Sequence, residues 1–423
     1  MTLTTAVVLA GGEGSRLQPL TANRPKPLLP AGGRPILEHV LDGLLAAGID
    51  EIHVVIGYRG DRVRDRFGPT YRNAELVYHR QAKRLGSGHA LLQARDAIAE
   101  PFIVVNGDQL VEPGLVGDVA GAHRNAGSMA TLGVVRSEAA TRYGAVELDR
   151  DDAVVDLNER PGDGDYELVN AGVYAFEAEF FETLAESPRI DGSLALPAVV
   201  ARIVESPEAS VQGVRTEGFW TDATYPWDLL DASQQLMSRG WIRIAPGDGE
   251  RGRAGADDVS ADVESGRAGT GPAGRWIADS ARLHPTATLR PPVAVDDDAV
   301  VGPGVVVGPN TVVGRNATLE ANAVVRSSVI DEDTRVGPNT TLTNCVTGQQ
   351  ARIGAGVTVS GGTADVRVGT TIHPDRRLGA VIADRATVGS GATIRPGVLI
   401  GPNVTVDDGA RIHTNVDAGE VIR

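Results

Sequence analysis

The stretch AVVLAGGEGSRL, residues 6–17, joins a short apolar run to a glycine-rich turn. The run from Ala6 to Ala10 ends in glycines, a pattern typical of a buried strand. A glycine-rich turn after such a strand lets backbone N–H groups approach phosphates closely, although many such turns are only structural. No Gly-Lys-Ser/Thr follows as in a Walker loop, and Leu17 stands where a dinucleotide fingerprint has its third glycine. The stretch therefore predicts a strand that leads into a candidate phosphate-binding turn.

Outward from this stretch, short apolar strands alternate with helical stretches over residues 1–240. Further strands are predicted at residues 52–56 and 102–105, and helices at residues 35–47 and 89–98. Alternation of this kind predicts an α/β domain whose mostly parallel sheet is covered by helices on both faces. We therefore expect a Rossmann-like first domain.

The last part of the chain, residues 276–423, carries an internal repeat with a period of six residues. Six residues form one short strand and a turn, and three such units close a triangular coil with its aliphatic side chains inside. The repeat predicts a β-helix, and its resemblance to hexapeptide-repeat proteins implies a left-handed coil, an exception to the usual crossover hand. The period slips by one residue before Ile330. The aliphatic positions that carry it are Val301, Val307, Val313, Leu319, Val325, Ile330, Val336, Leu342, Ile382, Val388, Ile394, Ile400, Val406 and Ile412.

Between these two parts, residues 246–274 are rich in Gly, Ala, Asp and Arg and contain almost no apolar residues. Such a composition cannot bury enough surface to fold alone. We therefore predict a flexible linker over residues 241–275.

The chain has 423 residues, 42% of them hydrophobic, and a formal net charge of −15. An acidic chain of this kind repels nucleic acid and anionic membranes, so neither is an expected partner. No apolar run approaches the roughly 18 residues that span a bilayer, and the first residues lack the basic region of a signal peptide. We expect a cytoplasmic protein. Its single cysteine, Cys345, excludes an internal disulfide and is predicted to be a small buried side chain.

Lysine is almost absent from the chain, since only Lys26 and Lys83 occur among 40 basic residues. An acidic chain with arginine in place of lysine is typical of proteins from salt-loving organisms, and GC-rich codon usage is the alternative explanation. A compact ammonium and a planar guanidinium are not interchangeable, so a retained lysine is a candidate functional residue. Lys26 lies between Pro25 and Pro27, which predict an extended, rigid segment.

Arg16 in the glycine-rich turn and Lys26 in Pro-Lys-Pro together supply the cations that a triphosphate requires. These residues resemble the signature of the sugar-phosphate nucleotidylyltransferase family, Gly-x-Gly-Thr/Ser-Arg followed by Pro-Lys. The resemblance implies that Arg16 and Lys26 are catalytic, because in that family this pair binds the triphosphate and stabilises the transition state. It also implies that the turn binds the nucleotide through Leu9, Ala10, Gly11, Gly12 and Gly14.

A second segment, residues 81–90, reads QAKRLGSGHA. It resembles the N-acetylglucosamine-1-phosphate uridylyltransferase branch of the family, in which the glutamine and the glycine after leucine read the base. The resemblance implies that Gln81, Gly86 and Ser87 bind the nucleotide, with UTP favoured and dTTP left open. His89 is expected to pack at the start of a helix, and Lys83 to be a surface residue.

Two further segments carry carboxylates. Asp108 follows the strand at residues 102–105, at the carboxyl end where ligands bind in open α/β sheets. A helix cap is the alternative for a lone aspartate there. The family resemblance implies that Asp108 binds Mg²⁺ together with Asp222, and two carboxylates offer the hard oxygen ligands that Mg²⁺ requires.

A fourth group of segments matches family stretches that line the sugar pocket. The resemblance implies sugar-binding roles for Gly144, Glu159 and Asn170, whose carboxylate and amide groups can bind sugar hydroxyls. Arg160 stands where the family usually has lysine, so the sugar stays open between glucose and N-acetylglucosamine 1-phosphates.

The family resemblance implies transfer of a nucleoside monophosphate from a nucleoside triphosphate to a sugar 1-phosphate. The β-helix is expected mainly to assemble the chain as a homotrimer. One alternative is a second, acetyl-CoA-dependent acetyltransferase site, as in bifunctional relatives that use a histidine and an asparagine around the coils. The stretch at residues 335–341 lacks that histidine, and His373 and His413 are expected to be turn residues. The other alternative is a non-catalytic nucleotide-binding regulator.

Overall fold

The computed structural model describes residues 3–112, 114–137, 144–159, 166–206, 210–242 and 274–423. Its contacts divide the chain into two compact units. The first unit contains Met1–Glu13, Pro25–Leu28 and Ile36–Asp222, and the second contains Gly14–Arg24, Leu29–Pro35 and Ala223–Arg423. The linker predicted at residues 241–275 lies almost entirely outside the described residues.

Among the described residues, ten strands of the first unit form one mixed sheet with β1 at its centre. β1 pairs in parallel with β4 on one side and β7 on the other, and β4 pairs in parallel with β6. Beyond β7 the sheet continues through β12, which runs antiparallel to β7 and β9. The strands are β11 (Val154–Asn158), β10 (Ala145–Leu148), β12 (Leu168–Phe176), β7 (Phe102–Asn106), β1 (Thr5–Ala10), β4 (Glu51–Ile56), β6 (Ala74–Arg80), β5 (Thr70–Tyr71), β9 (Ala130–Arg136) and β13 (Val211–Thr216).

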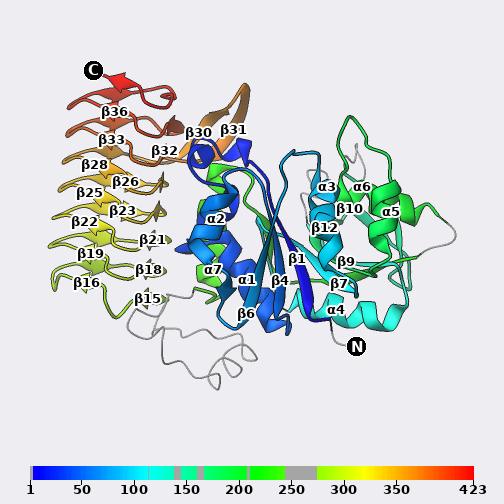
Figure 1. Cartoon of the computed structure of the whole chain (residues 1–423). Helices are drawn as coiled ribbons and strands as arrows, with labels where there is room; N and C mark the ends of the chain where they lie inside the picture. Colours follow the sequence, from blue (N-terminus) through cyan, green and yellow to red (C-terminus); the bar gives the residue numbers. More distant parts are fainter. Residues whose placement is uncertain (1–2, 113, 138–143, 160–165, 207–209, 243–273) are drawn as a thin grey trace. The chain divides into compact units, whose positions relative to one another are not determined.

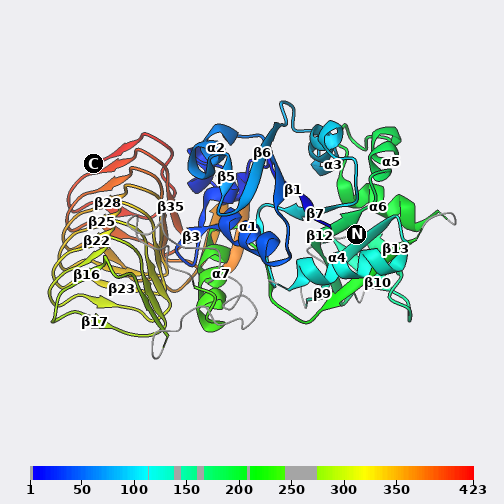
Figure 2. The ribbon, with the colours of Figure 1, turned by 60° about the horizontal axis from the view of Figure 1, so that its bottom comes forward.

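Helices cover both faces of this sheet, as Figure 2 shows. Alternate residues of β1 enter two different cores: Ala6 and Val8 pack with α1, α2 and α4, whereas Val7 packs with α3, α5 and α6. A strand that is buried on both faces explains the continuous apolar run from Ala6 to Ala10. The helices are α1 (Ile36–Ala46), α2 (Gly60–Phe67), α3 (Ser87–Leu91), α4 (Leu115–Ala126), α5 (Phe180–Glu186) and α6 (Leu196–Val204).

The predicted strand–helix alternation is confirmed, with two differences. The helix expected over residues 89–98 is the short α3 followed by the 3₁₀ segment η4 (Leu92–Ala97). The second difference is that the sheet is mixed rather than mostly parallel. β12 runs antiparallel to β7 and β9, and β10 runs antiparallel to β11 and β12, none of which was predicted. No helix among the described residues is long and apolar enough to cross a membrane.

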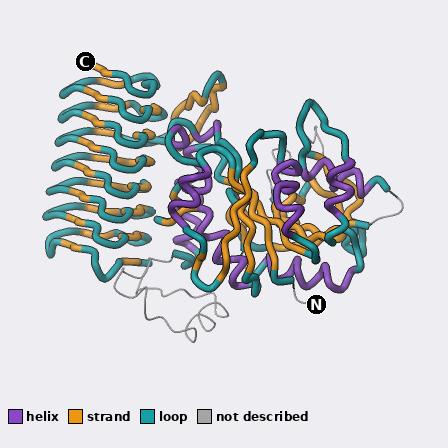
Figure 3. Tube along the Cα trace, in the orientation of Figure 1, coloured by secondary structure: helices purple, strands orange, loops and turns teal. Residues whose placement is uncertain are grey.

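In the second unit, short parallel strands stack into the three faces of a left-handed β-helix (Figures 1 and 3). The first face is β15 (Arg275–Ile277), β18 (Val293–Val295), β21 (Thr311–Val313), β24 (Val329–Ile330), β27 (Val346–Thr347), β32 (Ala380–Ile382) and β35 (Val398–Ile400). The second is β16 (Arg282–Leu283), β19 (Val300–Val301), β22 (Thr318–Leu319), β25 (Arg335–Val336), β28 (Arg352–Ile353), β33 (Thr387–Val388), β36 (Thr405–Val406) and β38 (Val421–Ile422). The third is β17 (Thr288–Leu289), β20 (Val306–Val307), β23 (Val324–Arg326), β26 (Thr341–Thr343), β29 (Thr358–Val359), β34 (Thr393–Ile394) and β37 (Arg411–Ile412).

The repeat residues fill the interior of these coils, as predicted. The aliphatic positions of the period form one continuous buried core, and Cys345 is buried within it. The slip of one residue appears in the register, where Val312 pairs with Val329 rather than with the next residue. Asparagines such as Asn316 and Asn322 adopt positive φ at the turns, a conformation that asparagine tolerates better than most residues.

Three further segments belong to the second unit. The helix α7 (Pro226–Ser238) packs against β24 and β27 of the first face, and a hairpin made of β30 (Thr363–Val368) and β31 (Thr371–Arg377) interrupts the coils. The chain segments Gly14–Arg24 and Leu29–Pro35 also cluster with this unit, and Gly32 N donates to Ser233 Oγ of α7 at 3.0 Å.

Candidate active site

Three widely separated residues meet in the first unit. Lys26 Nζ lies 2.8 Å from Asp108 Oδ2 and 2.6 Å from Asp222 Oδ1. The lysine side chain is 9% exposed, so its ammonium is withdrawn from water between the two carboxylates. These residues were predicted site residues from three different motifs, and the structure brings their side chains into contact.

The strands explain how the two carboxylates converge. Asp108 lies directly between β7 and the short strand β8 (Gln109–Val111), and Asp222 ends β14 (Trp220–Asp222). β14 pairs antiparallel with β8, and the register places Asp222 opposite Gln109. The two-stranded ribbon therefore fixes both aspartates beside the carboxyl end of β7, where open sheets bind ligands.

Burial and charge act in opposite directions on Lys26. Desolvation of the buried ammonium lowers its pKa, but the carboxylates of Asp108 and Asp222 raise it by more, so its pKa lies above the ordinary value. The prediction of an extended segment was wrong, because Lys26 begins the 3₁₀ turn η3 (Lys26–Leu28), in which Leu28 N donates to Pro25 O at 3.0 Å. This turn packs against α1.

The carboxylate pair fits a magnesium site in its chemistry. Mg²⁺ is commonly held by one or two carboxylates, with water and substrate phosphates as the other ligands. Oδ2 of Asp108 and Oδ1 of Asp222 converge on a single cation, the ammonium of Lys26. Among the described residues, no group of three or more His, Cys, Asp or Glu could hold a metal. A metal here would therefore depend on these two carboxylates and on ligands from substrate and water.

The glycine-rich turn begins where β1 ends. Tyr58 N donates to Gly11 O at 3.3 Å, and a Cβ on Gly57 would lie 2.6 Å from that oxygen. A side chain on Gly11 would meet Gln81 Oε1 at 3.1 Å, so the absence of side chains brings the turn close to the second motif. Gly12 is exposed with open space around it.

Gln81 is buried, and its amide is held by two contacts. Nε2 donates to Gly86 O at 3.0 Å and lies 3.1 Å from His89 Nδ1. Because an amide NH₂ only donates, the ring nitrogen accepts, which requires the neutral imidazole. Burial, followed by the charge of Arg189, lowers the pKa of His89 and favours that state. His89 was expected to be structural, and its spacing of eight residues from Gln81 carries no signal of this contact.

Gly86 and Ser87 have backbone and packing roles in the structure. Gly86 has φ +100°, and a Cβ there would overlap Leu194 O. Ser87 Oγ accepts a hydrogen bond from Leu196 N at 2.9 Å, at the start of α6. The predicted contact of Ser87 with nucleotide therefore competes with an internal hydrogen bond.

Of the residues predicted to bind sugar, Asn170 is buried and Glu159 is exposed. Asn170 lies on β12, where Nδ2 donates to Tyr174 Oη at 2.6 Å and Oδ1 accepts from Gly172 N at 2.9 Å. Asn170 N also donates to Gly144 O at 2.8 Å, so these two predicted residues are neighbours. Glu159 is exposed after β11. Arg160 lies outside the described residues.

A bulge in β12 connects this region to the carboxylate pair. The register of β12 shifts between Asn170 and Tyr174, and Gly172 within the bulge has φ +70°. A Cβ on Gly172 would overlap Gln109 Oε1, and Ala171 O accepts from Trp220 Nε1 at 3.3 Å. The bulge thus contacts both strands of the ribbon that carries the carboxylates.

Arg16 and Gly14 belong to the second unit. Gly14 has φ +64° and directly precedes the 3₁₀ segment η1 (Ser15–Leu17), so a glycine suits this position. Arg16 is exposed, and its Cζ lies 5.8 Å from the centroid of the Tyr225 ring.

Two family models match the chain. The nucleotidyl transferase model matches residues 5–239, which include every predicted site residue. The model described as the GMPPB C-terminal domain matches residues 289–374 within the β-helix.

One relative matches almost the whole of this chain, and another matches about half of it. The "Bifunctional protein GlmU" of Methanococcus maripaludis strain C7 is 31% identical over 99% of this chain and 96% of the relative. Another relative, the "UTP--glucose-1-phosphate uridylyltransferase AglF" of Haloferax volcanii, is 31% identical over 55% of this chain and 96% of its own length.

Among solved structures, a UDP-glucose pyrophosphorylase complexed with UDP-glucose matches 56% of this chain and 99% of its own, with a TM-score of 0.51 and 20% identity. This likeness shows the fold of the first unit. The family model covers more than half of the chain, and the full-length relative is 31% identical. The chain is therefore a member of the nucleotidyl transferase family, as its motifs predicted.

Proposed function

We propose that the chain transfers a nucleoside monophosphate from a nucleoside triphosphate to a sugar 1-phosphate and releases pyrophosphate. The observation that carries this proposal is the buried contact of Lys26 with Asp108 and Asp222 in a nucleotidyl transferase fold. The names of the relatives, a uridylyltransferase and a bifunctional GlmU protein, agree with it.

The reaction requires alignment and charge neutralisation more than proton transfer. An oxygen of the sugar phosphate attacks the α-phosphorus in line, a new P–O bond forms, and the bond to the pyrophosphate oxygen breaks. The nucleophile is already an anion, so no general base is needed to create it. Cations that disperse the charge on the α-phosphorus are then the main requirement.

The chain's own residues would meet this requirement with three kinds of group. Arg16 and Lys26 would bind the triphosphate, and the backbone of the turn from Leu9 to Gly14 would contact its phosphates. Asp108 and Asp222 would hold Mg²⁺, which spreads the negative charge of the α- and β-phosphates when bound. Lys26 contacts both carboxylates, and it would exchange them for phosphate oxygens when the triphosphate binds.

Base recognition is assigned to Gln81 and Gly86. The amide of Gln81 is fixed by Gly86 O and His89 Nδ1, so its orientation is set before a base arrives. The resemblance of residues 81–90 to the uridylyltransferase branch favours a pyrimidine triphosphate, UTP or dTTP. The sugar would be a glucose or N-acetylglucosamine 1-phosphate, with Glu159, Asn170 and Gly144 lining its pocket.

A substrate panel tests the proposal. Purified full-length protein with Mg²⁺ is given each of five nucleoside triphosphates with glucose 1-phosphate, glucosamine 1-phosphate or N-acetylglucosamine 1-phosphate, and pyrophosphate is measured. We expect release with UTP or dTTP that depends on the sugar phosphate. Binding of nucleotide without pyrophosphate in any combination would favour the non-catalytic regulator instead.

A second activity, acetyl transfer in the β-helix, is favoured only by the name of the full-length bifunctional relatives. His373 offers little support as its acid–base group. The prediction that it is a turn residue was wrong, because it lies in β31, where its ring is 4.6 Å from Tyr225 and 5.3 Å from Trp227 between centroids. Consumption of acetyl-CoA with glucosamine 1-phosphate would establish the second activity.

The proposal also covers the oligomeric state, the cellular compartment and the salt concentration in which the protein works. The β-helix would assemble the chain as a homotrimer, which light scattering of the full-length protein would measure. The protein would act in the cytoplasm. Its charge of −15 and its two lysines suit a cytoplasm of high salt concentration. Full activity and stability in a buffer of low ionic strength would count against that last assignment.

A further inference from the structure

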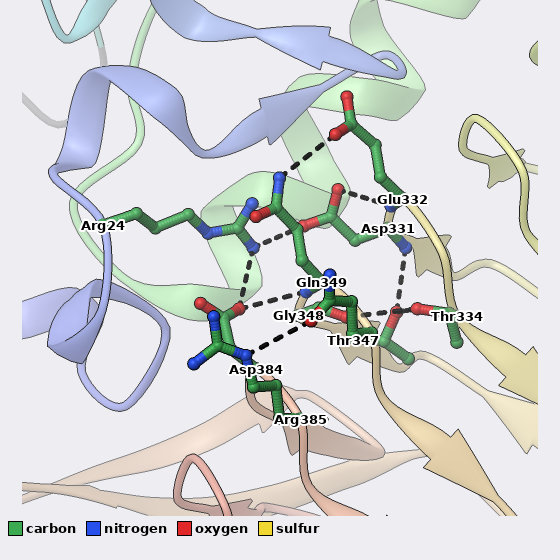
Figure 4. Close-up of polar contacts among 10 residues, drawn as sticks. Arg24, Asp331, Glu332, Thr334, Thr347, Gly348, Gln349, Asp384 and Arg385 are labelled. Carbon is green, nitrogen blue, oxygen red and sulfur yellow. Dashed lines mark hydrogen bonds and ion pairs between the residues drawn. The ribbon is translucent and has the colours of Figure 1, made fainter. Parts of the chain in front are cut away.

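Arg24 is a fully buried arginine whose partners come from the β-helix. It ends the loop Gly14–Arg24, and its side chain is 2% exposed. Its Nη2 pairs with Asp331 Oδ2 and lies 3.4 Å from Asp384 Oδ1. Figure 4 shows the guanidinium directed at both carboxylates. A buried guanidinium without such partners would be strongly disfavoured, so the loop depends on these two aspartates.

The two aspartates are held in place by the coils themselves. Asp331 follows β24, and its N–H donates to Thr347 Oγ1 at 2.8 Å. Asp384 follows β32, and its Oδ1 accepts from Gln349 N at 3.0 Å. On the coil between them stands Gly348, where a Cβ would overlap Asp384 Oδ1. The corner of three successive coils is therefore shaped to present two carboxylates to one cation.

A second contact joins the same loop to the start of α7 through an aromatic ring. Arg16 lies over the ring of Tyr225, which stacks on Trp227 with 4.7 Å between centroids. His373, on the hairpin β30–β31, packs on both rings. The loop thus contacts elements of the second unit at its start and at its end.

We propose that the β-helix positions the loop Gly14–Arg24 for nucleotidyl transfer, with Arg24, Asp331 and Asp384 as positioning residues. The inference rests on the proposed function, because it assigns these residues to the support of Arg16 and Lys26. It gives the β-helix a role in the first domain's reaction that is separate from trimer formation.

The positions of Arg16 and Lys26 along the chain explain how a fixed Arg24 would position both side chains. Arg16 lies eight residues before Arg24, and Lys26 follows it after a single proline whose φ is restricted. An ion pair that fixes the guanidinium of Arg24 therefore limits the backbone between the two proposed catalytic side chains. Small displacements of groups that stabilise a transition state reduce turnover strongly.

The test compares Arg24→Lys with Arg385→Lys in the full-length protein. Lysine keeps the positive charge, but it replaces the planar guanidinium, whose Nη2 contacts both carboxylates, by a compact ammonium on a flexible stem. Arg385 is exposed and adjacent to Asp384, so it is the matched control. We expect Arg24→Lys to lower kcat about tenfold or more, with KM for the triphosphate changed less than about threefold. Arg385→Lys should keep wild-type values.

A purely structural role for Arg24 would give a different result. It would lower the melting temperature and leave the kcat of the folded enzyme unchanged. Asp384→Asn, which keeps the acceptor for Gln349 N, decides the question if Arg24→Lys does not fold. A folded variant with wild-type kcat overturns the inference.

The aromatic contact of Tyr225, Trp227 and His373 allows a second, independent test of the inference. His373→Ala should lower kcat by a few fold, whereas Ile372→Ala, at a 52% exposed neighbour on the same strand, should not. Equal kcat values for these two variants would contradict a role of the aromatic contact in positioning the loop. A wild-type protein that shows no pyrophosphate release overturns the proposed function and this inference together, whereas an active wild type with unchanged variants overturns only the inference.

Discussion

Replacement of Lys26 by methionine tests the carboxylate pair directly. Methionine has a similar length and no charge, so Asp108 and Asp222 would face each other without the ammonium between them. Their oxygens are 2.8 and 2.6 Å from the same nitrogen and are therefore at most about 5.4 Å apart. Two unit charges at that separation repel by about 3 kcal/mol at an effective dielectric constant of about 20.

Solvent reduces this repulsion, because the Asp108 side chain is 35% exposed. We therefore expect Lys26→Met to lower the free energy of unfolding by about 1–3 kcal/mol in the absence of divalent cations. The melting temperature should fall by several degrees. Added Mg²⁺ should raise it more in the variant than in the wild type, because Lys26 no longer competes for the carboxylates.

Thermal unfolding of both proteins over a series of Mg²⁺ concentrations provides the measurement. Lys83→Met is the matched control, since Lys83 is the other lysine and is exposed. That control should show the wild-type response to Mg²⁺. An identical Mg²⁺-dependent shift in wild type and Lys26→Met would refute the reasoning that the lysine and a metal share one site.

Further predictions concern the metal, the base and the β-helix. Asp222→Asn should raise the Mg²⁺ concentration for half-maximal pyrophosphate release by about tenfold or more, and an unchanged value would argue against Asp222 as a ligand. His89→Ala removes the acceptor that orients Gln81 and should raise KM for UTP several-fold with a small effect on kcat, which steady-state kinetics would measure. Burial raises the pKa of Asp296 to about 6, above the 3.8 of an unfolded chain, so its ionisation in the folded state costs stability as pH rises through about 6. Asp296→Asn keeps the acceptor for Asp297 N and should raise the melting temperature at pH 8 more than at pH 5.

Local patterns in the sequence predicted much of the fold. The apolar run at β1 and the alternation that follows it identify a sheet covered on both faces, because both are set by burial along single elements. The period of six residues identifies the β-helix down to the slip before Ile330, which the register reproduces. The scarcity of lysine indicated that Lys26 is a candidate functional residue. The structure places that lysine between the two predicted carboxylates.

Contacts between distant segments were not predictable in the same way. Arg24 and Asp331 are separated by 307 residues, and nothing in the local pattern of either segment indicates the other. The contact of His89 with Gln81 depends on how the chain turns at Gly86, where φ is +100°. Both contacts depend on the three-dimensional arrangement, because each joins polar side chains that only folding brings together.

The proposed reaction joins a nucleotide to a sugar phosphate. The most direct test is ³¹P nuclear magnetic resonance of a reaction containing the full-length protein, Mg²⁺, UTP and N-acetylglucosamine 1-phosphate or glucose 1-phosphate. We expect a nucleoside diphosphate sugar and pyrophosphate in equal amounts, and neither product with the Lys26→Met variant. Orthophosphate and a nucleoside diphosphate as products, or unchanged substrates with every pyrimidine triphosphate, would contradict it.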